Sequence, residues 1–274
     1  MKNEQAPEAP VILTDVDERI GVITLNRPHR LNALNGALID ALDEAVREMA
    51  ADDGVKVVVL TGAPKGDAPG GFCSGGDIKD GGGPRRGTLG ADPDAAEDDL
   101  SRYDLHAPML LHTMAKPAIA MIGGPAVGAG CSLAAACDLR YASEDAAFMS
   151  SFSSVGLSGD YGGSLFWTRV MGTARTREFY YLNERLTAQQ AYEWGMLNKV
   201  LPPEELRDYT MSVAQKMLRV PATLLALIKN NLTEAEEEAD RRRYLFDLEA
   251  RNQRQAGKDI VQRMRKKAQT KSSR

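Results

Sequence analysis

The sequence is poor in the residues that build metal centres, disulfide frameworks and membrane spans. Its 274 residues include three cysteines and three histidines, with no CxxC and no HExxH motif, so we expect no metal site. A sparse, odd set of thiols is typical of a reducing compartment and predicts a cytoplasmic protein. No apolar run reaches the length of a membrane span. The polar, proline-containing stretch 1–10 does not resemble a signal peptide.

Charge does not indicate nucleic acid as the main partner. The formal net charge is −4, whereas nucleic-acid-binding domains are usually basic. Basic residues are concentrated from residue 251 onward, where nine lysines and arginines stand against one aspartate. We interpret this tail as the solvated face of a helix and keep RNA binding as the alternative.

The most informative stretch is 119–141, with the sequence IAMIGGPAVGAGCSLAAACDLRY. A short apolar strand leads through glycines into a run of small residues, which predicts a buried helix. The first N–H groups of a helix have no intrahelical partner and can bind a negative charge, and glycines let the backbone approach a ligand. We therefore predict an oxyanion-binding helix start, with a pure packing helix as the alternative.

Two other interpretations of this stretch fail on sequence alone. The chain has no GxxxxGK[ST] phosphate loop, and its glycines do not match a dinucleotide fingerprint. A serine nucleophile elbow at Ser132 would need a histidine after it, but His29, His106 and His112 all precede it.

Hydrophobic periodicity predicts a mixed α/β chain. Apolar residues spaced three and four apart predict a helix over 34–49, and Thr187 with Gln190 forms a candidate capping box. A charged turn is expected at 15–19. The predicted strands are 11–14, 20–25, 55–61, 139–141 and 147–149. The opening order of strand, strand, helix, strand indicates a ββα unit that repeats.

Four segments in this order resemble the crotonase superfamily, also called the enoyl-CoA hydratase/isomerase family. They are LNRPHRLNALN (25–35), FCSGGDIK (72–79), KPAIAMIGGPAVGAGCSLAAACDLRYA (116–142) and LTAQQAYEWGMLNKVLP (186–202). The resemblance implies an α/β fold, a crotonase-like spiral of ββα units with a C-terminal helical trimerisation region. We accordingly expect a flexible N-terminus at 1–10, a spiral core at 11–201 and a helical oligomerisation region at 202–274.

The resemblance also implies a substrate and partners. The family acts on acyl-coenzyme A thioesters through an enolate, so we expect coenzyme A thioester as substrate and no permanently bound cofactor. We expect a homotrimer or a dimer of trimers, and neither a membrane nor a nucleic acid as partner.

Matching the family's pattern residue by residue implies the site. The two oxyanion N–H donors fall at Gly76 and at Ala129, where the family usually has glycine; losing one such donor typically costs about 2.7–4 kcal/mol. The positions expected near coenzyme A are His29 and Arg30 at its phosphates, and Ser74, Asp77 and Lys79 near its adenine end. Ordinary loop solvation is the alternative for these polar residues.

The chain departs from the family at its two hydratase glutamates. Their positions hold Ser132 and Phe152, so the two-glutamate mechanism is not available. A serine could only hold a water, and a phenylalanine could only pack against an acyl chain. One carboxylate remains in the corresponding loop, Asp160, at a place where the chlorobenzoyl-CoA dehalogenase branch carries its nucleophile. Asp160 could instead be the N-cap of a helix over about 161–171.

We therefore expect an enzyme of the enoyl-CoA hydratase/isomerase class, a lyase or isomerase, that stabilises a thioester enolate with Asp160 as acid/base. The first alternative is a thioester hydrolase or a ring-cleaving or dehalogenase-like enzyme that uses Asp160. The second is a non-catalytic coenzyme A-binding or RNA-interacting protein. Cys73 is a further candidate nucleophile, although a small buried packing residue is the commoner role.

Overall fold

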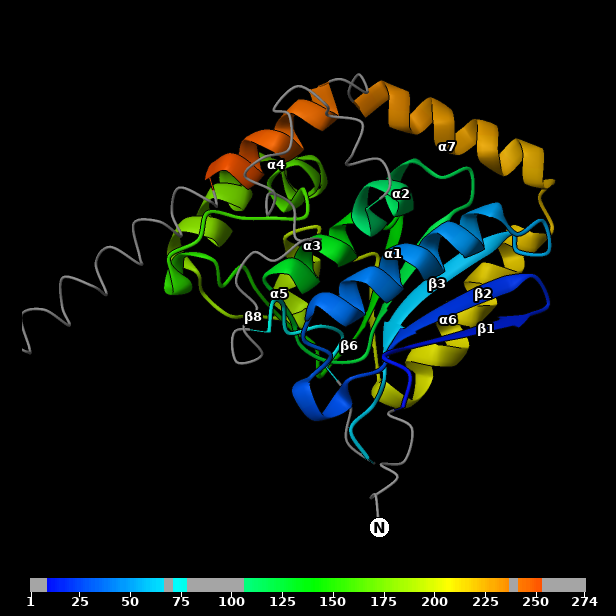
Figure 1. Cartoon of the computed structure of the whole chain (residues 1–274), viewed down its shortest axis with the longest axis horizontal. Helices are drawn as coiled ribbons and strands as arrows, with labels where there is room; N and C mark the ends of the chain where they lie inside the picture. Colours follow the sequence, from blue (N-terminus) through cyan, green and yellow to red (C-terminus); the bar gives the residue numbers. More distant parts are fainter. Residues whose placement is uncertain (1–8, 67–70, 78–105, 237–240, 253–274) are drawn as a thin grey trace, which may run out of the picture.

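The computed structural model describes residues 9–66, 71–77, 106–236 and 241–252 (Figure 1). The strands are β1 (Ile12–Asp17), β2 (Ile20–Leu25), β3 (Val57–Gly62), β4 (Ala118–Ile122), β5 (Ala126–Val127), β6 (Leu139–Ser143), β7 (Ala147–Met149), β8 (Leu186–Thr187) and β9 (Lys199–Leu201). The helices are η1 (Pro28–Arg30), α1 (Gly36–Ala51), α2 (Ala107–Thr113), α3 (Ala129–Ala136), η3 (Ser153–Val155), α4 (Gly163–Leu182), α5 (Ala188–Glu193), α6 (Pro203–Leu218) and α7 (Ala222–Glu236). A further helix covers residues 241–252.

The strands form two sheets. The larger has the order β1-β2-β3-β4-β6-β9, in which only the β1–β2 pair is antiparallel. The smaller has the order β5-β7-β8. Each neighbouring parallel pair is connected through helical segments, as a crossover connection requires. The predicted mixed α/β class built from ββα units is therefore confirmed.

Helices cover both faces of the larger sheet, because alternate side chains of its central strands are apolar on each face. In β3, Val58 and Leu60 join the core cluster under α1, whereas Val57 and Val59 face the opposite side. There they meet Leu206 of α6, and Figure 1 shows α1 and α6 on opposite sides of the strands. A β-strand apolar on both faces is what a parallel sheet between two helical layers needs.

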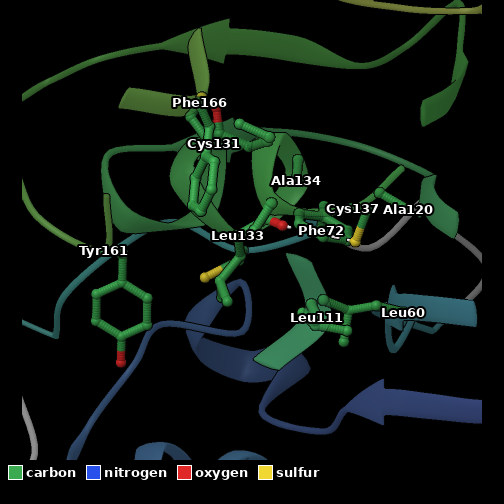
Figure 2. Packing of buried hydrophobic residues seen from close by; sticks show 14 of the residues in the cluster. Leu60, Phe72, Leu111, Ala120, Cys131, Leu133, Ala134, Cys137, Tyr161 and Phe166 are labelled. Atoms are coloured by element: carbon green, nitrogen blue, oxygen red, sulfur yellow. Dashed lines mark hydrogen bonds between the residues drawn. The ribbon is translucent and has the colours of Figure 1, made fainter. Parts of the chain in front are cut away.

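The small-residue helix α3 lies in the centre of the core. All eight of its residues are buried, and Figure 2 shows Leu133, Ala134 and Cys137 packed near Phe72 and Leu111. Small side chains let the surrounding backbone approach this helix closely. The predicted burial of the helix is confirmed.

Two predicted boundaries are wrong. β1 continues through Asp17, so that the expected charged turn is reduced to Glu18 and Arg19, both with positive φ. The helix expected at 161–171 begins instead at Gly163 and continues to Leu182, across a break at Gly172 where φ is 77°. The capping box of Thr187 and Gln190 is confirmed.

The C-terminal helices differ in how they meet the core. α6 covers one face of the sheet, whereas α7 exposes four large apolar side chains, Leu224, Leu227, Ile228 and Leu232. Within the described ranges no single helix is long and apolar enough to span a membrane; only α6 and α7 together, bent by 105°, meet that test. The domain limits at 1–10, 11–201 and 202–274 and the trimerisation role remain predictions.

Lys229 attaches α7 to the core and gives a test of this packing. Its buried Nζ donates to the carbonyls of Leu111 (2.7 Å) and Lys116 (3.0 Å) and to Asp138 Oδ2 (2.8 Å). We expect Lys229→Met to lower the free energy of unfolding by about 2–3 kcal/mol, below the range for fully buried pairs because Asp138 is partly exposed.

Chemical denaturation would measure this change. Lys216→Met, at an exposed lysine of α6, is the matched control and should stay within about 0.5 kcal/mol of the parent. Equal effects of the two substitutions would contradict an anchoring role for Lys229.

Candidate active site

The loop 71–77 is held between two segments of the chain. On one side Cys73 pairs with β5, since its N–H donates to Pro125 O (3.2 Å) and its carbonyl accepts from Val127 N (2.9 Å). On the other side Leu34 N donates to Gly75 O and Leu34 O accepts from the Asp77 N–H, both at 2.8 Å. The loop is thereby fixed like a short central strand.

Two glycines let this loop lie directly on the start of α3. A Cβ added at Gly130 would be 2.1 Å from the carbonyl oxygen of Cys73. Gly75 has φ of 84°, and a Cβ there would be 2.8 Å from Val127 O. That same Cβ position lies 3.5 Å from the amide nitrogen of Ala129. The contact therefore brings the loop and the N-terminus of α3 together.

The two predicted oxyanion donors, Gly76 and Ala129, both occur at this junction. Ala129 is the first residue of α3, preceded by Gly128 with φ of 54°, and Gly76 is the next residue after Gly75 in the loop. Among the described residues, neither N–H donates a hydrogen bond. Two adjoining N–H groups without acceptors, one at a helix start, can receive a developing negative charge. Their catalytic role remains a prediction.

Asp160 is half-buried in the turn before α4, whose other residues, Gly159, Tyr161 and Gly162, are buried. Its backbone carbonyl accepts from Gly163 N (3.0 Å), and the N-cap of α4 is Gly162 rather than Asp160. The side-chain capping alternative for Asp160 is therefore wrong. The carboxylate that accepts from Gly162 N, at 2.7 Å, belongs instead to Glu249.

The negative charge of Asp160 contributes to the raised pKa of Cys73, in the loop 71–77, and of Tyr161 and Tyr180. Burial, and to a lesser extent Asp160, raises the pKa of Cys73 to about 12. Burial is also the main cause that raises the pKa of Tyr161 and Tyr180 well above 10, with Asp160 contributing to both. A buried thiol with a raised pKa is a poor nucleophile, which favours the packing role of Cys73.

Ser132 stands one turn into α3, and its surroundings were not predicted. Its Oγ is buried, and a side-chain hydrogen bond with Ser132 opposes the rise that burial causes in the pKa of Tyr180. A Cβ added at Gly163 would be 2.2 Å from this Oγ and 2.6 Å from the hydroxyl of Tyr180. The ring of Tyr180 stacks on Phe152, with centroids 5.8 Å apart. Ser132 and Phe152, at the two positions where hydratases carry glutamate, are therefore both next to Tyr180.

Four of the residues predicted to bind coenzyme A gather around η1. His29 is exposed, Ser74 Oγ donates to Arg30 O (3.2 Å), and Arg30 Nε lies 4.0 Å from Asp77 Oδ2. Asp77 is buried and forms an ion pair with buried Arg27 at 3.0 Å, so its carboxylate anchors the loop. The sequence analysis did not single out Arg27. Lys79 lies outside the described residues, and coenzyme binding by the whole set remains a prediction.

The remaining histidines take structural positions. His106 Nδ1 lies 2.9 Å from Asp43 Oδ2, which joins the start of α2 to α1. Burial, followed by the charges of Lys229, Arg169 and Arg242, lowers the pKa of His112 to about 3. In the described ranges no three His, Cys, Asp or Glu side chains are grouped to hold a metal ion.

Comparison with known proteins defines the class to which this fold and site belong. Residues 15–270 match the model of the enoyl-CoA hydratase/isomerase family. The chain is 35% identical, over 90% of each chain, to 1,2-epoxyphenylacetyl-CoA isomerase of Escherichia coli. It is 31% identical to a 4-chlorobenzoyl coenzyme A dehalogenase of an Arthrobacter species, over 80% of this chain and 76% of that one.

Solved structures of enoyl-CoA hydratases and isomerases have a similar fold. An enoyl-CoA hydratase from Mycobacterium tuberculosis is 28% identical with a TM-score of 0.74, over 92% of this chain and 99% of that one. A monofunctional enoyl-CoA isomerase from M. smegmatis is 26% identical with a TM-score of 0.67, over 84% and 95%. The chain belongs to the enoyl-CoA hydratase/isomerase family and has the crotonase fold. It is an enzyme with isomerase or lyase chemistry.

The contact between Gly130 and Cys73 can be tested directly. We expect Gly130→Ala to destabilise the protein by about 2–3 kcal/mol, because its methyl group would have to displace backbone at Cys73. The loop that carries Gly76 would move with it, so turnover should also fall.

Thermal unfolding followed by circular dichroism would measure the change. Gly36→Ala is the control, because a Cβ at Gly36 in α1 meets nothing within 4 Å and should stabilise by about 0.4–1 kcal/mol. A Gly130→Ala protein as stable as the Gly36→Ala protein would refute the close contact.

Proposed function

We propose that this enzyme isomerises an acyl-coenzyme A thioester by moving a proton through an enolate. The observation that carries the proposal is the pair of N–H groups at Gly76 and Ala129, which have no acceptor among the described residues. They lie at the helix start that is next to the Asp160 turn. Removal of an α-proton places negative charge on the thioester oxygen, which is the atom that such a pair stabilises.

Asp160 is the acid/base in this proposal. The positions of the two hydratase glutamates hold Ser132 and Phe152, so addition of water lacks both of its usual carboxylates. Isomerisation needs one group that takes a proton and returns it elsewhere, which a single carboxylate can do. The 35% identical relative named as an isomerase supports this choice over hydration.

We propose a planar or ring-bearing acyl group as the substrate class. A Cβ built at Gly128 would be 3.9 Å from Phe152 Cε1, so this ring lies beside the residue that precedes the Ala129 donor. The stacked pair of Phe152 and Tyr180 offers an aromatic surface next to the proposed oxyanion position. The ring-bearing acyl group in the name of the isomerase from E. coli is consistent with such a surface.

A second reaction uses the same carboxylate as a nucleophile. The dehalogenase relative, 31% identical over 225 residues, favours testing attack by Asp160 on an aryl thioester. Release of chloride from 4-chlorobenzoyl-CoA would establish this second reaction, whereas no release would leave proton transfer as the activity.

The proton-transfer proposal predicts a loss of turnover in Asp160→Asn. Conversion of 3-hexenoyl-CoA would be followed at the absorbance of the conjugated thioester, and α-proton exchange of phenylacetyl-CoA would be followed by NMR in D₂O. We expect kcat to fall about 10²- to 10⁴-fold, while the Kd for coenzyme A changes less than threefold. Unchanged turnover would remove Asp160 from the mechanism, and brisk hydration of crotonyl-CoA would contradict the argument from the missing glutamates.

The oxyanion donors predict a separate effect for Ala129→Pro. Proline removes the N–H but is tolerated in the first turn of a helix, so α3 should still form. We expect kcat to fall about 10²- to 10³-fold with an unchanged circular dichroism spectrum. A folded variant that keeps full turnover would show that Ala129 N–H is not a donor to the substrate.

A further inference from the structure

The turn that carries Asp160 has an unfavourable backbone. Gly159, Tyr161 and Gly162 have φ values of 137°, 56° and 70°. Tyrosine rarely adopts a positive φ, because its Cβ then approaches the following carbonyl. Such a conformation persists only where the surrounding structure imposes it.

Glu249 supplies that constraint from the C-terminal helix over 241–252. Its carboxylate accepts hydrogen bonds from Gly162 N at 2.7 Å and from Ser164 N at 3.2 Å. These N–H groups belong to the first turn of α4, which has no capping side chain of its own. Figure 1 shows the helix over 241–252 beside α4. Glu249 thus caps α4 although it is 85 positions beyond Ser164.

The helix over 241–252 also packs directly against the backbone of the turn 159–162. A Cβ at Gly159 would be 2.7 Å from Glu249 Oε1, and a Cβ at Gly162 would be 2.2 Å from the ring of Phe246. Phe246 is 1% exposed and contacts Phe166 edge-on, with ring centroids 5.7 Å apart. Both ends of the four-residue turn therefore contact one face of this helix.

Burial and hydrogen bonding act on the charge of Glu249 in opposite directions. Burial raises the pKa of Glu249, and the hydrogen bonds from Ser164 and Gly162 oppose that rise. The positive end of the α4 dipole favours the ionised carboxylate at this place. Glu249 is only 7% exposed, and both of its oxygens accept from α4, so the substrate cannot easily reach it.

We propose that Glu249 is a positioning residue for the reaction, which fixes the 159–162 turn so that Asp160 is held at the site formed by Gly76 and Ala129. The proposal rests on the proposed function, in which Asp160 moves the proton. A carboxylate displaced by about 1 Å can lose about 10²-fold in rate. A cap that serves stability alone would leave the turnover of the folded enzyme unchanged.

The test compares Glu249→Gln and Glu249→Ala with Asp247→Asn in the full-length enzyme. Asp247 is a buried carboxylate on the same helix and pairs within that helix with Arg251 at 3.0 Å, so it controls for loss of a buried charge. The readouts are kcat and KM for 3-hexenoyl-CoA and α-proton exchange of phenylacetyl-CoA. Rates are normalised to coenzyme A-binding sites counted by calorimetry, so an unfolded fraction does not register as lost turnover.

We expect a graded loss in kcat with little change in KM. Glu249→Gln keeps one acceptor oxygen and should lower kcat about 10-fold, and Glu249→Ala keeps none and should lower it about 100-fold. Asp247→Asn should stay within threefold of the parent. If both Glu249 variants keep kcat within twofold per binding site, or if Asp247→Asn loses as much as Glu249→Gln, the positioning role is refuted.

Asp160→Asn, measured in parallel, separates this inference from the proposed function. If Asp160→Asn is inactive and the Glu249 variants are fully active, the result supports the proposed function and refutes the positioning role of Glu249. If Asp160→Asn keeps its turnover, the proposed function fails, and the role of Glu249 fails with it.

Discussion

The close approach of the Cys73 carbonyl to Gly130 is the contact on which the site depends. Because Gly130 has no Cβ, the loop 71–77 lies directly on the first turn of α3. The loop is paired on both sides, and α3 is buried along its whole length. Neither segment can move alone. The N–H groups of Gly76 and Ala129, which come from distant parts of the sequence, therefore keep a fixed separation.

Such a fixed pair is unfavourable in the free protein and would be useful in the proposed reaction. A buried donor without an acceptor costs about 1–3 kcal/mol, which applies to Ala129 more than to the exposed Gly76. In the proposed reaction each donor would stabilise the transition state by about 2.7–4 kcal/mol. The gain exceeds the cost because the donors are already oriented when charge develops. The rigid contact at Gly130 supplies that orientation before the substrate arrives.

Patterns of neighbouring residues predict single helices, strands and caps. They do not predict contacts between residues that are far apart in the sequence. The apolar period of α1, the β-branched run of β3 and the capping box of α5 were all readable, since each lies within one element. The site junction could be predicted only through the family resemblance. The N-cap alternative for Asp160 is wrong, because capping rules consider the nearest residues, whereas the N-cap of α4 is Gly162 and its N–H donates to Glu249. No spacing in the sequence indicates that contact.

The protonation of the neighbouring groups restricts how the proton can move. Burial keeps the Cys73 thiol and the hydroxyls of Tyr161 and Tyr180 protonated, and Glu249 is engaged with the first turn of α4. Of the described side chains placed at the site, Asp160 is then the one left to accept a proton. A single carboxylate that removes a proton and returns it must approach the enolate from one side. The proposed isomerisation is therefore suprafacial, with both proton transfers on the same face of the acyl group.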